Sequence, residues 1–113
     1  MVVARSKYLK QLDDLAAAME DLGQKTVADV TAAGLALAKG DVEAAEEVIS
    51  GEMRMRRLRA TIEDTCLDIM LMQQPLVADD LRFVSGSFRL VSDLAHIDSK
   101  SRDVAFLATQ IPH

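Results

Sequence analysis

Carboxylates are the first candidates for chemistry in this sequence. Acids four residues apart share one face of a helix, and two such pairs on facing helices can build an oxygen-ligand metal site. Two pairs with this spacing occur in the middle of the chain, Glu43 with Glu47 and Asp64 with Asp68. A third run, Asp93, Asp98 and Asp103, is spaced by five, which turns each carboxylate about 140° beyond the last. Asp98 also lies four residues before Arg102, which favours an ion pair, so spacing alone assembles no metal site.

A cluster of arginines, RMRRLR at residues 54–59, could bind an anionic partner or form ion pairs along an exposed helix face. Acids one helical turn away predict two such ion pairs, Glu52 with Arg56 and Arg59 with Glu63. Arg54 and Arg57 have no acid at that spacing. These two arginines are therefore candidates for contact with an anionic partner.

Nucleophilic catalysis finds no support in the sequence. The only cysteine, Cys66, lies beside an apolar seam and is expected to be a buried thiol. Of the two histidines, His113 is terminal, and His96 has Asp93 one turn before it and Lys100 one turn after it. This setting predicts a hydrogen-bonded surface histidine. No glycine-rich phosphate loop is present, and we expect a protein that is not an enzyme.

The composition narrows the class of protein. The 113 residues include 13 Lys and Arg against 18 Asp and Glu, and half are hydrophobic, which excludes global disorder. A single Cys excludes a disulfide framework, and a net charge of −5 with one Tyr and three Phe argues against a nucleic-acid platform. No apolar run approaches the ~20 residues of a membrane span. The start, MVVARSKYLKQLDD, lacks the pattern of a signal peptide, so we expect a cytoplasmic protein.

The elements that must position these side chains are helices. Strong breakers stand only at Gly40 and Pro75, and the segments between them are rich in helix formers. The sequence therefore predicts an all-α fold of three long antiparallel helices, up-down-up, near residues 6–39, 41–74 and 79–111. Asp79 or Asp80 can cap the third helix. We expect residues 1–113 to form a single domain.

Apolar residues step by three and four along each segment, as in antiparallel helices that pack like a coiled coil. In the first segment the stripe shifts after Gly23 and continues through Val27, Val30, Gly34 and Leu37. The predicted core is made of Met55, Leu58, Ile62, Ile69, Leu81, Val84, Phe88 and Val91. The third segment carries a second apolar stripe, Phe83, Leu90, Leu94, Ile97, Val104, Ala108 and Ile111. This stripe either faces a broad groove of the same chain or forms an interface with another.

Four stretches of the chain resemble the PhoU family of bacterial phosphate-signalling regulators. They are AAEEVISGE (44–52), LRATIEDTCLDIM (58–70), QQPLVADDLR (73–82) and RLVSDLAHID (89–98). The resemblance implies three-helix repeats, normally two in a chain, of which this sequence has one. It is either a natural single-repeat form or half of a longer protein.

The resemblance also implies a metal motif with acids four apart on the second and third helices. These positions fall here on Glu52 and Arg56, and on Ala95 and Ser99. Only one of four carboxylates is present, and arginine and alanine cannot coordinate a hard cation. We therefore expect no metal and no other cofactor. If a metal were found, Glu52, His96 and Asp98 would be the first suspects.

The function implied by the resemblance is that of a non-enzymatic regulator in phosphate homeostasis. Such a protein docks to a phosphate ABC transporter, a sensor histidine kinase, or both. The candidate docking residues are Asp80 and Arg82, with Arg54 and Arg57 as a second patch. We also expect a homodimer, in which each chain replaces the missing repeat of the other.

Two alternatives remain open at this stage. The first is a metal-carboxylate bundle for storage or redox chemistry, which needs a Glu-x-x-His pair. Asp93 and His96 are the only approximation to that pair. The second is a divergent PhoU-like remnant that keeps the bundle and acts only as an interaction module.

Overall fold

The computed structural model describes the backbone of residues 2–73 and 75–112, and the side chains of 6–73 and 75–112. It contains four α-helices: α1 (Val2–Lys39), α2 (Val42–Ser50), α3 (Glu52–Met72) and α4 (Ala78–Gln110). The described residues form no strand, and the all-helical prediction is confirmed.

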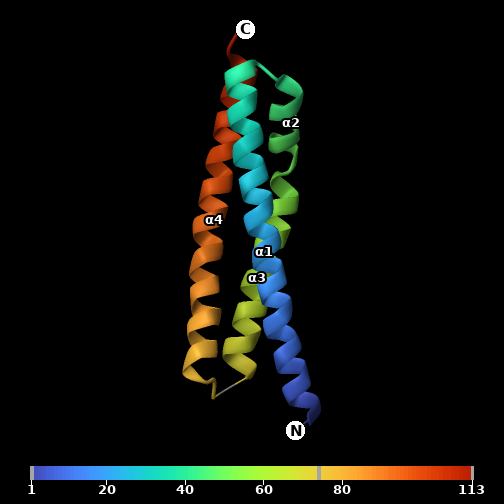
Figure 1. The fold of residues 1–113 in the computed structure, drawn as a ribbon, viewed down its shortest axis with the longest axis vertical. Coiled ribbons are helices and arrows are strands. Elements are labelled where there is room, and N and C mark those ends of the chain that lie inside the picture. Colours follow the sequence, from blue (N-terminus) through green and yellow to red (C-terminus); the bar gives the residue numbers. More distant parts are fainter. Residues whose placement is uncertain (1, 74, 113) are drawn as a thin grey trace.

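The helices form a slender rod of 62 × 20 × 16 Å. In Figure 1, α1 rises along the long axis, α2 and α3 return one after the other, and α4 rises again. Every helix packs against α4, and α1 also contacts α2 and α3. The molecule therefore consists of three helical rods packed side by side, which run in alternating directions. The second rod is made of two helices, α2 and α3.

The break in the second rod corrects the prediction of a continuous helix over 41–74. Helix α2 ends at Ser50 and α3 begins at Glu52, with Gly51 between them at φ −80° and ψ −3°. Hydrogen bonds continue across the junction, because the Gly51 N–H donates to the Val48 carbonyl and the Met55 N–H donates to that of Gly51. Glycine is less favourable in a helix than alanine by about 1 kcal/mol, which explains why the break occurs at Gly51. The direction of the chain does not change there (Figure 1).

The two turns between rods follow different chemistry. Gly40 ends α1 with a φ of 71°, and Asp41 caps α2 by accepting a hydrogen bond from the Ala44 N–H at 3.0 Å. Helix α4 begins at Ala78 after the extended Val77, which offers no side-chain cap. The prediction that Asp79 or Asp80 caps this helix is wrong, because both residues lie within its first turn. There their negative charges interact favourably with the positive end of the helix dipole.

The main core lies in the lower half of the bundle as drawn in Figure 1, where α1, α3 and α4 meet. Its buried members are Leu15, Leu22, Met55, Ile62, Cys66, Ile69, Val84 and Val91. Five of the eight predicted core residues are among them, and Leu58 and Phe88 pack against the cluster while partly exposed. The prediction for Leu81 is wrong, because this residue, in the first turns of α4, is 46% exposed.

The buried cysteine predicted from the sequence is present. Cys66 is fully buried within the main core. Burial, and then the neighbouring Glu63 carboxylate, raises the pKa of its thiol above the ordinary value. The group is thus protonated at neutral pH and behaves as a small apolar side chain.

A second core at the other end of the bundle is built from small side chains. Its buried members are Ala33, Ala36, Ala45, Val48, Ala105 and Ala108, from α1, α2 and α4. Alanines allow the helices to approach closely. The predicted stripe through Val27, Val30 and Gly34 is wrong, because all three are exposed, whereas Leu37 packs against this core.

The second apolar stripe of α4 divides between the inside and the surface. Leu94 packs against the main core and Val104 against the alanine core, where Ala108 is buried. Phe83, Leu90 and Ile97, seven residues apart, remain exposed along one edge of the helix. In the described part of the chain, no helix has a stretch long and apolar enough to cross a membrane.

Candidate functional site

The structure brings the four motif positions together at one hollow between α3 and α4. Glu52 and Arg56 lie one turn apart on α3, and Ala95 and Ser99 lie one turn apart on α4. All four line a cavity of about 180 Å³, whose other walls are Leu22, Met55, Arg59, Asp98 and Arg102. We call this cavity the α3–α4 hollow. Its location was therefore predictable from the motif, although its chemistry differs from the family pattern.

The arginines of the hollow form the ion pairs expected from their spacing. The Arg56 Nη2 donates to Glu52 Oε1 at 2.9 Å, and the Arg59 Nε donates to Glu63 Oε1 at 2.9 Å. The Arg56–Glu52 pair is exposed and the Arg59–Glu63 pair is partly exposed, so each stabilises the fold by only about 0.3–0.5 kcal/mol. Their main effect is to hold two guanidinium groups at the edge of the hollow.

These residues do not fit the metal that the family motif implies. The one remaining carboxylate, Glu52, is already paired with Arg56, the residue at the second motif position. The third and fourth positions, Ala95 and Ser99, bring a methyl and a hydroxyl group. Among the described residues, no group of three or more His, Cys, Asp and Glu is placed to hold a metal ion.

Deeper in the bundle, Asp98 forms a buried ion pair. Its side chain is 1% exposed, and its Oδ2 accepts a hydrogen bond from the Nη1 of Arg102, which is 16% exposed. This pair was predicted from the spacing of four. Burial makes it costly to break, because removing one partner leaves a charge in the interior without compensation.

Asp29 on α1 faces the same pair and was missed by the sequence reasoning. Asp29 Oδ2 and Asp98 Oδ1 are the two buried side-chain oxygens in the described residues that have no fixed hydrogen-bond donor. Burial first, then the hydrogen bond and charge of Asp98, raises the pKa of Asp29 from 3.8 to about 7. Arg102 and Arg54 act in the opposite direction. Asp29 therefore holds a proton in the fold below about pH 7.

A signal for Asp29 was present in the sequence. Buried residues recur every seven positions along the helices: Leu15, Leu22 and Ala36 on α1, and Val84, Val91 and Ala105 on α4. Asp29 and Asp98 occupy the remaining place in each series. Two acids at core positions of two packed helices predict a buried carboxyl pair.

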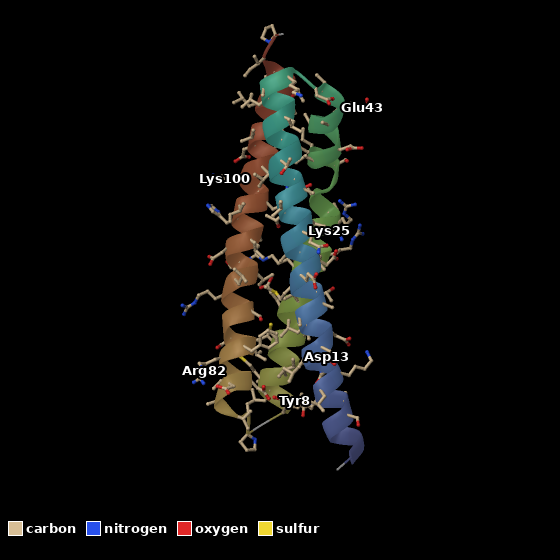
Figure 2. The ribbon with its side chains drawn as sticks, in the orientation of Figure 1. Tyr8, Asp13, Lys25, Glu43, Arg82 and Lys100 are labelled. Atoms are coloured by element: carbon tan, nitrogen blue, oxygen red, sulfur yellow. The ribbon has the colours of Figure 1, made fainter. Side chains whose placement is uncertain are left out.

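The candidate docking residues lie in two places. Asp80, near the start of α4, accepts a hydrogen bond from the Tyr8 hydroxyl of α1. Arg82 is 73% exposed, pairs with Asp79, and points outward near the lower end of the bundle (Figure 2). Asp80 thus ties α1 to α4, while Arg82 is open to a partner.

The second patch lies near the break at Gly51. Arg54 lines a separate cavity of about 470 Å³ between α1, α2 and α3, together with Asp29 and Glu47. Arg57 is exposed on α3. The two arginines lie one turn apart on α3, and of the two only Arg54 lines this cavity. His96 is exposed on α4, whereas Asp98, two residues later, is buried, so the suspected metal ligands point in different directions.

Fold and site together define a slender helical bundle with arginines and carboxylates at one α3–α4 face. The chain belongs to the PhoU family, because the PhoU domain model matches residues 10–108.

Named relatives agree with this assignment. The chain is 31% identical to a "Phosphate-specific transport system accessory protein PhoU homolog" of Aquifex aeolicus, over 88% of this chain and 44% of the relative. It is 32% identical to the homolog of Streptococcus pneumoniae serotype 4, over 95% of this chain and 49% of the relative. The accessory protein PhoU of Serratia marcescens is 29% identical over 80% of this chain and 37% of its own length. The chain therefore spans less than half the length of these relatives. No solved structure matches it significantly.

Proposed function

We propose that this protein is a non-enzymatic regulator in bacterial phosphate homeostasis that acts by docking in the cytoplasm to a phosphate ABC transporter, a sensor histidine kinase, or both. The observation that carries the proposal is the match of the PhoU domain to residues 10–108. The names of the relatives as accessory proteins of phosphate transport support it. A helical bundle of this kind can act by binding one conformation of a partner more tightly than another, which shifts the partner's conformational equilibrium.

The docking surface we propose is the end of the bundle around Arg82. This side chain is exposed and can exchange its contact with Asp79 for one with a partner at little cost, because exposed ion pairs contribute little. Asp80 contributes indirectly by fixing the start of α4 against Tyr8. Arg54 and Arg57 form a second proposed contact region.

The experiment is a binding measurement between the purified chain and the purified transporter or kinase from the same cell. We expect Arg82→Gln to weaken binding by about tenfold, as for one lost charge-assisted contact. Lys100→Gln is the matched control, because Lys100 is an exposed cation of α4 that also pairs with an acid three residues away. It lies farther up the same helix (Figure 2). Equal loss in both variants would show a general charge effect and refute the Arg82 surface.

We also propose that the chain forms a homodimer through the exposed edge of α4. Phe83, Leu90 and Ile97 present an apolar stripe, and Gly86 on the same helix has open space where a Cβ would lie. The matched region spans less than half of each relative, and a second copy would place a second three-helix repeat beside the first. Exposed apolar stripes of this kind commonly mark interfaces.

Sedimentation velocity at tens of micromolar tests the dimer. We expect Leu90→Glu to shift the chain toward monomer without loss of helix content. Phe106→Glu is the control, because Phe106 is also exposed on α4 but lies about 160° around the helix from Leu90. A monomeric parent chain would refute the proposal. Leu94 and Val104 are unsuitable for this test because both pack inside their own chain.

We propose further that the protein works without a metal or other cofactor. The support is the chemistry of Arg56, Ala95 and Ser99, which replace three of the four motif acids. Elemental analysis of untagged protein tests this: stoichiometric iron, zinc or manganese would refute it. Loss of that metal in Glu52→Ala or Asp98→Ala would then locate the ligands.

A further inference from the structure

The α3–α4 hollow gathers three guanidinium groups around one small space. Arg56 and Arg59 come from successive turns of α3, and Arg102 comes from the facing side of α4. Two helices thus supply cations to opposite walls of a cavity of about 180 Å³. This volume equals that of about six water molecules, at ~30 Å³ each.

Each of these arginines has donors to spare. A guanidinium carries five N–H groups in a planar fork. Arg56 gives one to Glu52, Arg59 gives one to Glu63, and Arg102 gives one to Asp98. The ion pairs therefore orient the guanidinium groups and leave most of their N–H donors for another acceptor. Ser99 adds a hydroxyl group to the lining.

Each carboxylate that lines the hollow is already paired with one of its arginines, Glu52 with Arg56 and Asp98 with Arg102. Asp29 of α1 lies beside Asp98. Glu63, the partner of Arg59, does not line the cavity. The lining itself holds three arginines against two acids, an excess of one positive charge. An entering anion therefore meets a surplus of both charge and donors.

We propose that the α3–α4 hollow binds one tetrahedral oxyanion, inorganic phosphate or a phosphate monoester, between Arg56, Arg59 and Arg102. The planar fork of arginine matches two oxygens of such an anion at once, which makes arginine the preferred residue for phosphate recognition. Three forks around one cavity can satisfy oxygens on three sides. The loss of the family's carboxylates thus converts a face suited to cations into one suited to anions.

This proposal does not depend on the docking function, since the isolated chain can be tested. Isothermal titration calorimetry at low ionic strength uses inorganic phosphate in one arm and phosphoserine in the other, with chloride at equal ionic strength as the blank. We expect saturable binding of one anion per chain in at least one arm. The tighter arm identifies the source of the phosphoryl group. Absence of binding in both arms, up to ten millimolar, would overturn the proposal.

Variants locate the site. We expect the double variant Arg56→Gln, Arg59→Gln to weaken binding by about tenfold or more, because two charge-assisted contacts are lost. Arg89→Gln is the matched control: Arg89 is an exposed arginine of α4 and does not line the cavity. It should bind within about twofold of the parent chain. Equal weakening in both proteins would reveal nonspecific charge binding and refute the site.

A variant that adds a negative charge to the hollow separates loss of binding from loss of the fold. Ala95→Glu places a carboxylate in the hollow from α4 and leaves every arginine intact. We expect it to abolish binding while circular dichroism shows unchanged helix content. If Ala95→Glu binds phosphate as tightly as the parent chain, the anion lies elsewhere and the proposal is wrong.

Discussion

The buried carboxyl pair makes a specific prediction about pH, which the variant Asp29→Asn tests. Asp29 faces Asp98 and Arg102 of α4, Arg54 of α3 and, across the neighbouring cavity, Glu47 of α2. Its pKa is raised to about 7 in the fold. An amide at this position keeps the shape of the carboxyl group, cannot ionise, and can donate an N–H to the unpaired oxygen of Asp98.

The sign follows from proton linkage. Between about pH 4 and pH 7 the folded chain holds a proton that the unfolded chain has released, so the free energy of unfolding falls as the pH rises. Below pH 4 both states are protonated, and above pH 7 the full penalty is present. A pKa raised from 3.8 to about 7 corresponds to at most about 4 kcal/mol. Asp29 is only partly buried and solvent screens it, so we expect about 2 kcal/mol.

Urea unfolding followed by circular dichroism measures this effect. At or below about pH 4 the variant Asp29→Asn should match the parent chain, and near pH 8 it should be more stable by about 2 kcal/mol. Asp13→Asn is the control, because Asp13 is an exposed acid of the same helix (Figure 2). Its stability should follow that of the parent at every pH. If Asp29→Asn also follows the parent at every pH, the fold does not raise the pKa of Asp29 and the reasoning is wrong.

Three further predictions concern stability, each measured by urea unfolding. Asp98→Ala should cost about 3 kcal/mol, because Arg102 loses the partner that compensates its charge; a change below 1 kcal/mol would show that Arg102 turns to solvent freely. Ile62→Ala should cost about 2–5 kcal/mol, since Ile62 is fully buried, whereas the exposed Thr61→Ala should change little. Gly51→Ala should stabilise the chain by about 0.4–1 kcal/mol, because an added Cβ meets nothing closer than 3.5 Å; a loss of stability would show that the break needs glycine.

The helices and most of the main core were predictable because their signals are local and periodic. Gly40 and Pro75 end two of the rods through backbone chemistry that any fold must respect. The break at Gly51 was missed because one glycine inside a helical pattern is usually tolerated. Leu81 was misplaced because periodicity identifies a face of a helix but not how much of that face is covered near the start of the helix.

The upper half of the bundle was harder to predict because its core uses small and polar side chains. Val27 and Val30 are more apolar than Ala33 and Ala36, so a count of apolar residues chose the wrong face of α1. Ala33 and Ala36 are buried because α1, α2 and α4 approach one another closely on that face of α1. Asp29 escaped notice for the same reason, because its burial follows from its place in the seven-residue series and not from its chemistry.

Asp98 joins the carboxyl pair to the α3–α4 hollow, and this connection makes the proposed anion site sensitive to pH. A bound anion adds negative charge beside Arg102, which weakens the effect of this arginine on Asp29 and so favours the protonated form of Asp29. Because linkage is reciprocal, the chain with Asp29 protonated must bind the anion more tightly than the chain with Asp29 ionised. Sulfate is the suitable probe, since its charge does not change between pH 5 and pH 8. We expect the parent chain to bind sulfate several-fold more tightly near pH 5 than near pH 8, and Asp29→Asn to bind it equally at both. A variant that keeps the full pH dependence of the parent would show that the proton comes from another group and that the two sites are independent.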